Sequence, residues 1–324
     1  MYNNEKSIKA LLAFFAAILL ALLFKAPGFF TKQNIYDIIL NTSTTVIAGI
    51  GMLAVILIGQ IDVSVGAILA VCCTITGVLA KAGIPIPLVV AATIVSGMVL
   101  GFINGVLVAI VKLEAIVATL SVMCIYRGIM ILLTGGNWIT GLPESILAIG
   151  QGRINGIPIP AVLMVVVVVA AYIAFSYTEA GRNLYAVGSN ISAARLSGVS
   201  VKRVQIGAFA FNGAMIGLTA LIFATRFGGV QSNAGKGFEM TAISAVVVGG
   251  ASLLGGSGGA ISTLLGGLLV SAIGTVLIFF HVDAYWEQAV QGAIILMSVA
   301  SYAIKWKSHG KQTPKRGGKT YETA

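Results

Sequence analysis

Residues able to carry out catalysis are scarce in this sequence. Only 9% of the 324 residues are charged, and there are 2 histidines and 3 cysteines. Covalent catalysis needs a nucleophile beside an activating base, and no Ser/His/Asp or Cys/His arrangement is visible. Cys72, Cys73 and Cys124 all lie inside apolar segments, without the spacing of a metal site. We therefore expect no enzyme activity, no metal site and no cofactor.

The C-terminal segment contains a fragment similar to the end of a nucleotide-binding P-loop, Gly318-Lys319-Thr320. The P-loop signature needs an earlier glycine, where this chain has Thr313, and a strand before it. No strand pattern precedes the fragment. The sequence therefore predicts no ATP site, and any work driven by ATP must come from another protein.

Several polar residues interrupt the apolar segments and are candidates for a solute pathway or for structural roles. They are Asp62, Ser64, Asn104, Arg127, Asn212 and Glu239. Asp62 stands at a predicted helix start, where helix capping is favoured over contact with a solute. Asn104 and Asn212 suit hydrogen bonds between helices better than contact with solute hydroxyls. Arg127 either pairs with Glu114 or lines a cavity, and Glu239 is expected to pair with Lys236.

These polar residues are set in long apolar segments, which we expect to be membrane-spanning helices. Hydrophobic residues make up 58% of the chain, and its mean hydropathy is +1.00. Apolar segments of about 20 residues match a bilayer core of about 30 Å, and lipid requires every backbone polar group to be paired internally. The segments are continuous, which excludes the alternating pattern of a membrane barrel. The sequence predicts an all-α, polytopic transmembrane helix bundle of about ten spans: 10–26, 38–58, 63–80, 86–110, 115–134, 158–177, 204–224, 239–250, 259–280 and 288–304.

Glycines recur at every fourth position within two of the predicted spans. Gly97, Gly101 and Gly105 share one helix face, as do Gly213 and Gly217. Small residues at this spacing let two helix backbones approach closely. We therefore expect tight helix crossings, with long loops only at 135–157 and 178–203, and we expect the segment 239–250 to be too short to cross a bilayer alone.

The segment 178–203 is a polar island between two apolar spans. Asn190 is a good helix N-cap, and Gly198 suits the left-handed position that ends a helix. Between them the sequence predicts a short helix, Ile191 to Ser197, with Ile191, Ala194 and Leu196 exposed. Such a helix fits a partner's groove, and packing against its own bundle is an equal alternative.

Basic residues set the predicted orientation, because cytoplasmic loops of membrane proteins are rich in Lys and Arg. The tail 305–324 is basic, and so is the loop 178–203, so we place both in the cytoplasm together with the N-terminus. Residues 1–304 then form the transmembrane domain. Lys25, Lys32 and Lys81 go against the rule. The net charge of +10 is an orientation signal, since no basic face with stacking aromatics predicts nucleic-acid binding.

Several short motifs occur along the chain. The loop 178–203 contains Gly181-Arg182, Tyr185-Ala186-Val187-Gly188, Asn190 and Ala193-Ala194-Arg195-Leu196-Ser197-Gly198. Further motif stretches are 59–66 (GQIDVSVG), 103–105 (ING), 127–128 (RG) and 239–259. In sequence and in order, over roughly 40–304, these motifs resemble those of bacterial ABC permeases for ribose, xylose, galactosides and related sugars. The similarity is closest to the subgroup that moves rhamnose-like sugars or the furanose quorum signal.

The resemblance implies a permease subunit of an ABC importer in the inner (plasma) membrane, moving a monosaccharide or related small polar solute inward. Its implied partners are a second permease subunit in a homo- or heterodimer, cytoplasmic ABC ATPase subunits and an extracytoplasmic solute-binding protein. The loop 178–203 would be the coupling element, with the short cytoplasmic coupling helix inside it. Its candidate residues are Arg182, Asn190, Ala193, Ala194, Arg195, Leu196 and Gly198.

Two alternatives remain beside this interpretation. Arg182 and Arg195 are explained equally well as topology anchors or as partners of acidic ATPase residues. An ion-coupled secondary transporter is the alternative function. It needs a titratable or ion-coordinating residue in mid-membrane, and carboxylates are almost absent from the middle of the predicted spans.

Overall fold

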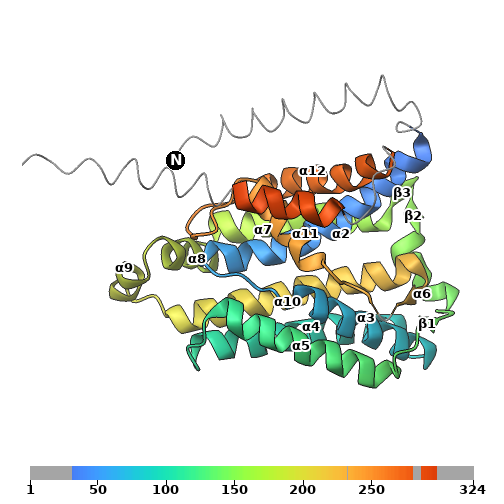
Figure 1. Cartoon of the computed structure of the whole chain (residues 1–324), viewed down its shortest axis with the longest axis horizontal. Coiled ribbons are helices and arrows are strands. Elements are labelled where there is room, and N and C mark those ends of the chain that lie inside the picture. The colour runs from blue at the N-terminus through green and yellow to red at the C-terminus, as the bar shows by residue number, and fades with distance from the viewer. Residues whose placement is uncertain (1–30, 232, 280–285, 298–324) are drawn as a thin grey trace, which may run out of the picture.

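The computed structural model describes residues 31–231, 233–279 and 286–297, and this part of the chain is mostly helical (Figure 1). The long helices are α2 (Lys32–Leu57), α4 (Ile86–Ala109), α5 (Ala115–Thr134), α7 (Ile159–Tyr177), α10 (Val201–Phe227) and α12 (Ala260–Phe279). The shorter helices are α3 (Val65–Lys81), α6 (Glu144–Gln151), α8 (Glu179–Ser189), α9 (Ile191–Leu196) and α11 (Phe238–Val248). The predicted all-α helix bundle is confirmed.

Within the described residues, 6 helices are long and apolar enough to cross a membrane. They are α2, α4, α5, α7, α10 and α12, and each overlaps one predicted span. Helices α3 and α11 are apolar but only 17 and 11 residues long. The predicted span 10–26 and the end of the predicted span 288–304 lie outside the described residues. The count of about ten spans therefore stays a prediction.

Helix α2 is the most buried of the spanning helices. In its most apolar window 83% of the residues are buried, against 22% for α4 and 28% for α7. A helix that is hydrophobic on all sides belongs in a core, and α2 packs against α7, α10, α11 and α12. The outer faces of α4, α5 and α7 expose large apolar side chains such as Leu88, Leu132 and Val166. Faces of this kind suit lipid or another membrane protein.

The glycine faces predicted on two spans meet each other, on α4 and α10. A Cβ added at Gly101 would overlap the carbonyl oxygen of Phe209, and one added at Gly213 would overlap that of Gly97. The two backbones are therefore in direct contact along this line, which we name the glycine seam (Gly97, Gly101, Gly213 and Gly217). The tight crossing expected from the sequence is confirmed.

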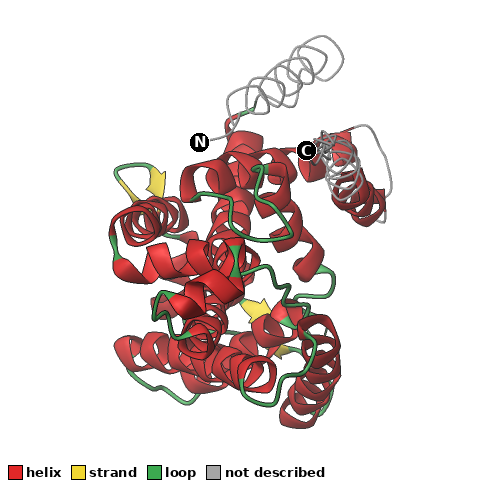
Figure 2. Ribbon diagram, turned by 90° about the vertical axis from the view of Figure 1, so that its left-hand side faces the viewer, coloured by secondary structure: helices red, strands yellow, loops and turns green. Residues whose placement is uncertain are grey.

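The two ends of the bundle carry different structures (Figure 1). One end carries α6 and two short antiparallel pairs, β1 (Ile139–Thr140) with β4 (Gly229–Val230), and β2 (Arg153–Ile154) with β3 (Ile157–Pro158). The other end carries α8 and α9, and Figure 2 looks onto it. The sequence predicts a loop over 135–157, but the structure forms β1, α6 and β2 there. Local apolar residues explain this difference, because Leu142 and Ile146 are buried against Val89 and Leu221.

Candidate functional site

Four of the polar candidates lie together in one buried cluster, which we name the Asp62 cluster (Asp62, Ser64, Asn104 and Asn212). Asp62 lies in the break between α2 and α3, while Asn104 is on α4 and Asn212 is on α10; all four residues are 0% exposed. The Asp62 carboxylate accepts hydrogen bonds from the Ser64 backbone N–H at 2.9 Å and from the Ser64 hydroxyl at 2.6 Å. It also accepts from the amide nitrogens of Asn212 at 3.0 Å and Asn104 at 3.4 Å. Both asparagines were expected to form hydrogen bonds between helices; from α4 and α10 they instead donate to the α2–α3 break, where Asn104 Nδ2 also donates to the Ser64 hydroxyl at 2.7 Å.

Asp62 was predicted to be the N-cap of the next helix, and this prediction was wrong. Helix α3 begins at Val65, and its N-cap is Ser64, whose side chain makes no capping hydrogen bond. Asp62 instead closes the turn before the helix by accepting from the Ser64 N–H. The backbone N–H of Val63 is held separately, by the hydroxyl of Thr119 on α5 at 3.1 Å. The carboxylate is placed by amide donors from distant helices, and local sequence spacing does not show these donors.

The Asp62 cluster leaves some polar atoms without partners. Asn104 Oδ1 and Asn212 Oδ1 are buried and make no hydrogen bond. Asn212 Oδ1 instead packs onto α2 at Gly51, where a Cβ would come within 2.7 Å of it. Burying a carboxylate costs several kcal/mol unless donors surround it. The arrangement therefore fixes the α2–α3 break to α4 and α10, and any change in their spacing has to break several hydrogen bonds together.

Arg127 and Glu239 lie near the start of α3 but not with the predicted partners. Arg127 Nη1 donates to the carbonyl oxygen of Ala234 at 2.6 Å. It does not reach Glu114, because the part of α5 between them spans about 20 Å. A carboxylate oxygen of Glu239 lies where a Cβ on Gly66 would be, and its Oε2 is buried without a hydrogen bond. Lys236 is exposed, so the expected pair of Glu239 with Lys236 is not the arrangement seen.

The short helix of the loop 178–203 is present as α9. Asn190 caps it, accepting from the Ala193 N–H at 3.0 Å, and Gly198 takes a left-handed φ of +85° just beyond its end. Ile191 is 44% exposed and Leu196 is 91% exposed, as predicted. Ala194 was also expected to be exposed, but it is 4% exposed. That prediction was wrong because Ala194 faces the core cluster of the bundle and holds α9 against it.

The basic candidates of this loop have different surroundings. Arg182, on α8, donates to the carbonyl oxygen of Tyr177 at the end of α7, at 3.4 Å. Arg195, on α9, is exposed together with Ala193. Helix α8 itself was not predicted. Its start is marked by Thr178, whose hydroxyl accepts from the Gly181 N–H at 3.2 Å, and a Thr cap of this kind is a signal that the sequence carries.

Helix α8 is joined to the rest of the bundle by a close backbone contact, which we name the Gly188 junction (Leu57, Gly188, Gly255 and Gly256). A Cβ at Gly188 would overlap the carbonyl oxygen of Leu57, the last residue of α2. The Gly256 N–H donates to that same carbonyl at 2.9 Å. Near it the Tyr185 hydroxyl donates to the Gly258 carbonyl at 2.9 Å, and burial raises the pKa of Tyr185, so its hydroxyl stays a donor.

The Gly188 junction was missed as a functional feature. The sequence shows the pattern Tyr185-Ala186-Val187-Gly188 and the glycine-rich turn at 249–259, but their contact depends on helices that are far apart in the chain. The contact links the loop that carries α9 to the end of α2, and Asp62 follows directly after that end. The two candidate regions are thus connected through the backbone.

Comparisons with known proteins identify the family of this chain. A family model described as branched-chain amino acid transport system / permease component matches residues 34–299. The autoinducer 2 import system permease protein LsrC of Escherichia coli (strain K12 / DH10B) is 38% identical over 301 residues, covering 91% of this chain and 86% of that protein. The proteins of the same name from Shigella flexneri and Salmonella paratyphi B are also 38% identical, cover 91% of this chain, and are themselves covered over 86% and 85% of their lengths.

No solved structure gives a significant match. The family match nevertheless covers residues 34–299, which is most of the chain. The relatives are similar over nearly the same length. The chain therefore belongs to this family, as a membrane permease component of a bacterial ABC importer.

Proposed function

We propose that this permease subunit moves a small furanose-like solute of the autoinducer 2 kind inward across the inner membrane, driven by a separate ATPase. The support for the solute is that relatives 38% identical over 91% of the chain are permease proteins of an autoinducer 2 import system. The support for an external ATPase is the surface of α9. Leu196, at 91% exposed, and Ile191, at 44% exposed, present an apolar surface on a capped helix.

Helix α9 is proposed as the docking element for the ATPase. A short helix with one apolar face is recognised by a groove that takes its side chains. Asn190 and Gly198 hold its two ends, Ala194 anchors it, and Leu196 and Arg195 are left for the partner. Arg182 on α8 and Ala193 on α9 are proposed as further contacts. An arginine at the rim of such an interface fixes register more than affinity.

The Gly188 junction is proposed as the route from the ATPase to the solute pathway. A displacement of α9 moves α8, and α8 is in backbone contact with the end of α2 at Leu57. Beyond Leu57 the chain enters the break that the Asp62 cluster fixes to α4 and α10. Asp62, Ser64, Asn104 and Asn212 are accordingly proposed as structural residues of the pathway wall, with Arg127 and Glu239 as pathway residues near the start of α3.

The working assembly is proposed to contain two permease subunits, two cytoplasmic ATPase subunits and an extracytoplasmic solute-binding protein. The exposed apolar faces of α4, α5 and α7 suit lipid and a second permease subunit. Both termini and the α8–α9 end are placed in the cytoplasm. Lys112, Arg182, Arg195, Lys202 and Arg203 belong to the loops and helix ends there, as expected for a cytoplasmic side.

Reconstitution tests this function. The chain is placed in proteoliposomes with its binding protein outside, with or without the partner ATPase and ATP, and uptake of labelled autoinducer 2 is measured. Uptake should require both the ATPase and ATP. Uptake by this chain alone under a proton or sodium gradient is the result that contradicts an ABC permease and supports the secondary transporter.

A competition measurement tests the solute separately. Unlabelled ribose, rhamnose and autoinducer 2 are added in excess to the ATP-dependent assay, and autoinducer 2 should compete best. If ribose or rhamnose competes better than autoinducer 2, the permease function stands and only the proposed solute is overturned.

A further inference from the structure

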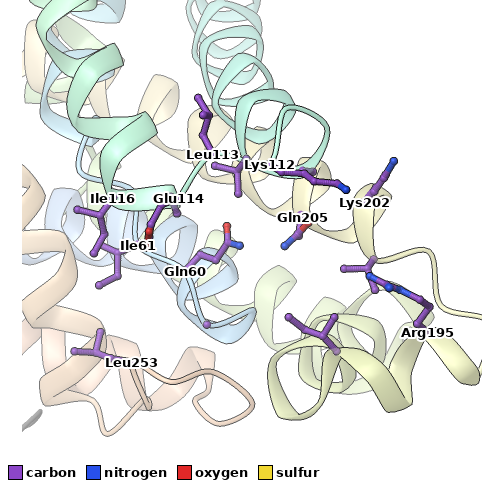
Figure 3. Close-up of a pocket in the computed structure, with 16 residues that line it drawn as sticks. Gln60, Ile61, Lys112, Leu113, Glu114, Ile116, Arg195, Lys202, Gln205 and Leu253 are labelled. Atoms are coloured by element: carbon purple, nitrogen blue, oxygen red, sulfur yellow. The ribbon is translucent and has the colours of Figure 1, made fainter.

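An open hollow of about 550 Å³ lies at the α8–α9 end of the bundle (Figure 3). Its wall is formed by the α2–α3 break, the turn between α4 and α5, helix α9 and the first turns of α10. The lining residues that matter here are Gln60, Lys112, Glu114, Arg195, Lys202 and Gln205. Figure 3 shows Lys112, Lys202 and Arg195 on one side of the hollow, with Gln60 and Glu114 across from them. The hollow therefore has a cationic side built from three separate segments.

The three cations of the hollow differ from Lys81, Arg226 and Arg153, whose charged groups have partners. Lys81 donates to the Thr140 carbonyl, Arg226 to Asn41 and Arg153 stacks over Tyr36. Among the described residues, no hydrogen bond or ion pair engages the charged groups of Lys112, Arg195 and Lys202. The one carboxylate that lines the hollow, Glu114, lies across from them. Like charges on one side of the hollow repel each other, so an anion bound between them lowers the free energy.

Lys112 adds a second observation that does not depend on charge. Its φ is +66°, a left-handed conformation that lysine adopts rarely. Lys112 lies two residues after Ile110, the C-cap of α4, and the Leu113 N–H that follows it donates to the Leu107 carbonyl at 3.2 Å. A lysine with a left-handed backbone places a charged side chain on the hollow at the cost of backbone strain. Strain of this kind is concentrated at binding sites.

We propose that the hollow binds a phosphate group between Lys112, Lys202 and Arg195. Arginine and lysine are the side chains that bind phosphate oxygens in proteins, through charge-assisted hydrogen bonds. Gln205 supplies a neutral amide on the same wall. The bound phosphate joins the α4–α5 turn to α9 and α10, so its presence holds α9 in place. The site is independent of the solute, but it shares Arg195 with the docking surface proposed for α9.

Two sources carry this chemistry, the headgroup of an anionic phospholipid and a free phosphate or phosphate ester. The full chain is placed in phosphatidylcholine nanodiscs, and inorganic phosphate binding is measured by titration calorimetry. Separately, phosphatidylglycerol retained on the purified chain is counted by native mass spectrometry. The variants are Lys112→Gly, which fits the left-handed backbone, and Lys202→Gln. The matched control is Arg203→Gln, a neighbouring exposed cation that does not line the hollow.

Saturable phosphate binding that weakens at least tenfold in Lys112→Gly and in Lys202→Gln, but not in Arg203→Gln, supports the site with free phosphate as its ligand. Retained phosphatidylglycerol that is lost in the same two variants, and kept in the control, supports the site with a lipid headgroup. Equal effects of all three variants, or no binding of either probe, overturn the proposal. Loss of ATPase association in the two variants without any anion binding overturns it as well, because the hollow then belongs to the ATPase interface.

Discussion

Two polar regions interrupt this apolar bundle, and they are built in opposite ways. The Asp62 cluster is fully buried, and its carboxylate is hydrogen-bonded by side chains from two other helices. Helix α9 rests on one buried alanine and leaves Leu196 91% exposed. Polar groups that are sealed inside the bundle hold helices together, whereas an exposed helix with an apolar surface is available to a partner. Substitutions in the buried region should therefore lower the stability of the bundle, whereas substitutions in α9 should lower the coupling of ATP hydrolysis to uptake.

The strongest test of the buried region is Gly101→Ala in the glycine seam. The new Cβ overlaps the Phe209 carbonyl and lies 3.0 Å from the backbone of Gly213, so α4 and α10 must move apart. We expect a loss of roughly 3 kcal/mol in unfolding free energy, measured by thermal or SDS unfolding in micelles.

The control for the seam is Gly207→Ala on α10, where nothing lies within 4 Å of the added Cβ. Alanine should stabilise that helix by about 0.5–1 kcal/mol. Equal stability of Gly101→Ala and Gly207→Ala contradicts the seam.

The next largest effect is expected for Asp62→Asn. The substitution removes the charge that Ser64, Asn104 and Asn212 hydrogen-bond, and it places an amide donor against theirs. We expect a loss of about 2–3 kcal/mol, since hydrogen bonds to a charged group contribute about 1.5–3 kcal/mol. Ser64→Ala leaves the asparagine contacts with Asp62 in place but removes the bonds of the hydroxyl to Asp62 and from Asn104, and it should cost about 1–2 kcal/mol. If the Asp62→Asn protein is as stable as the wild type, the Asp62 cluster does not hold the α2–α3 break to α4 and α10.

Gly198→Ala is expected to lower stability less than Gly101→Ala and Asp62→Asn do, and to lower the coupling of ATP hydrolysis to uptake more. No atom lies within 4 Å of the new Cβ, but the left-handed backbone disfavours alanine. We expect about 1 kcal/mol of destabilisation and a shifted end of α9. ATP hydrolysis by the assembled importer should continue while uptake falls. Full uptake with a strained Gly198→Ala chain contradicts a coupling role for this end.

The smallest effect on stability is expected for Leu196→Ser and Arg195→Glu. Both side chains are exposed, so unfolding free energies should stay within about 0.5 kcal/mol of the wild type. Uptake per ATP hydrolysed should nevertheless drop severalfold, because the docking surface is altered. Arg203→Glu is a matched charge reversal on α10, outside α9, and should leave coupling unchanged. Normal coupling in both α9 variants removes the proposed role of α9.

Much of the bundle could be predicted from the sequence because its signals are local. Hydropathy located the six spanning helices, the glycine spacing predicted tight helix crossings without naming which helices meet, and Asn190 with Gly198 marked the two ends of α9. The surroundings of the candidate residues could not be predicted. Asp62 meets Asn104 and Asn212 across 42 and 150 positions, and no spacing rule connects residues at such separations.

The α9 region shows the same limit on a smaller scale. The sequence predicted three exposed apolar side chains, but Ala194 is buried. A helix of 6 residues has no long periodic pattern from which to infer the inward face. The inward face of α9 depends on how the preceding helix α8 is oriented, and α8 was not predicted.

The sequence by itself determined which segments are apolar helices, where backbones can approach and where one short helix is capped, because hydrophobicity, side-chain size and capping act within a few residues. The tertiary structure decided which polar groups meet. The Asp62 cluster, the Gly188 junction and the cationic hollow each combine segments that are distant in the chain. Their geometry follows from how whole helices pack, since a buried carboxylate, a glycine contact and a charged hollow exist only once those helices are side by side.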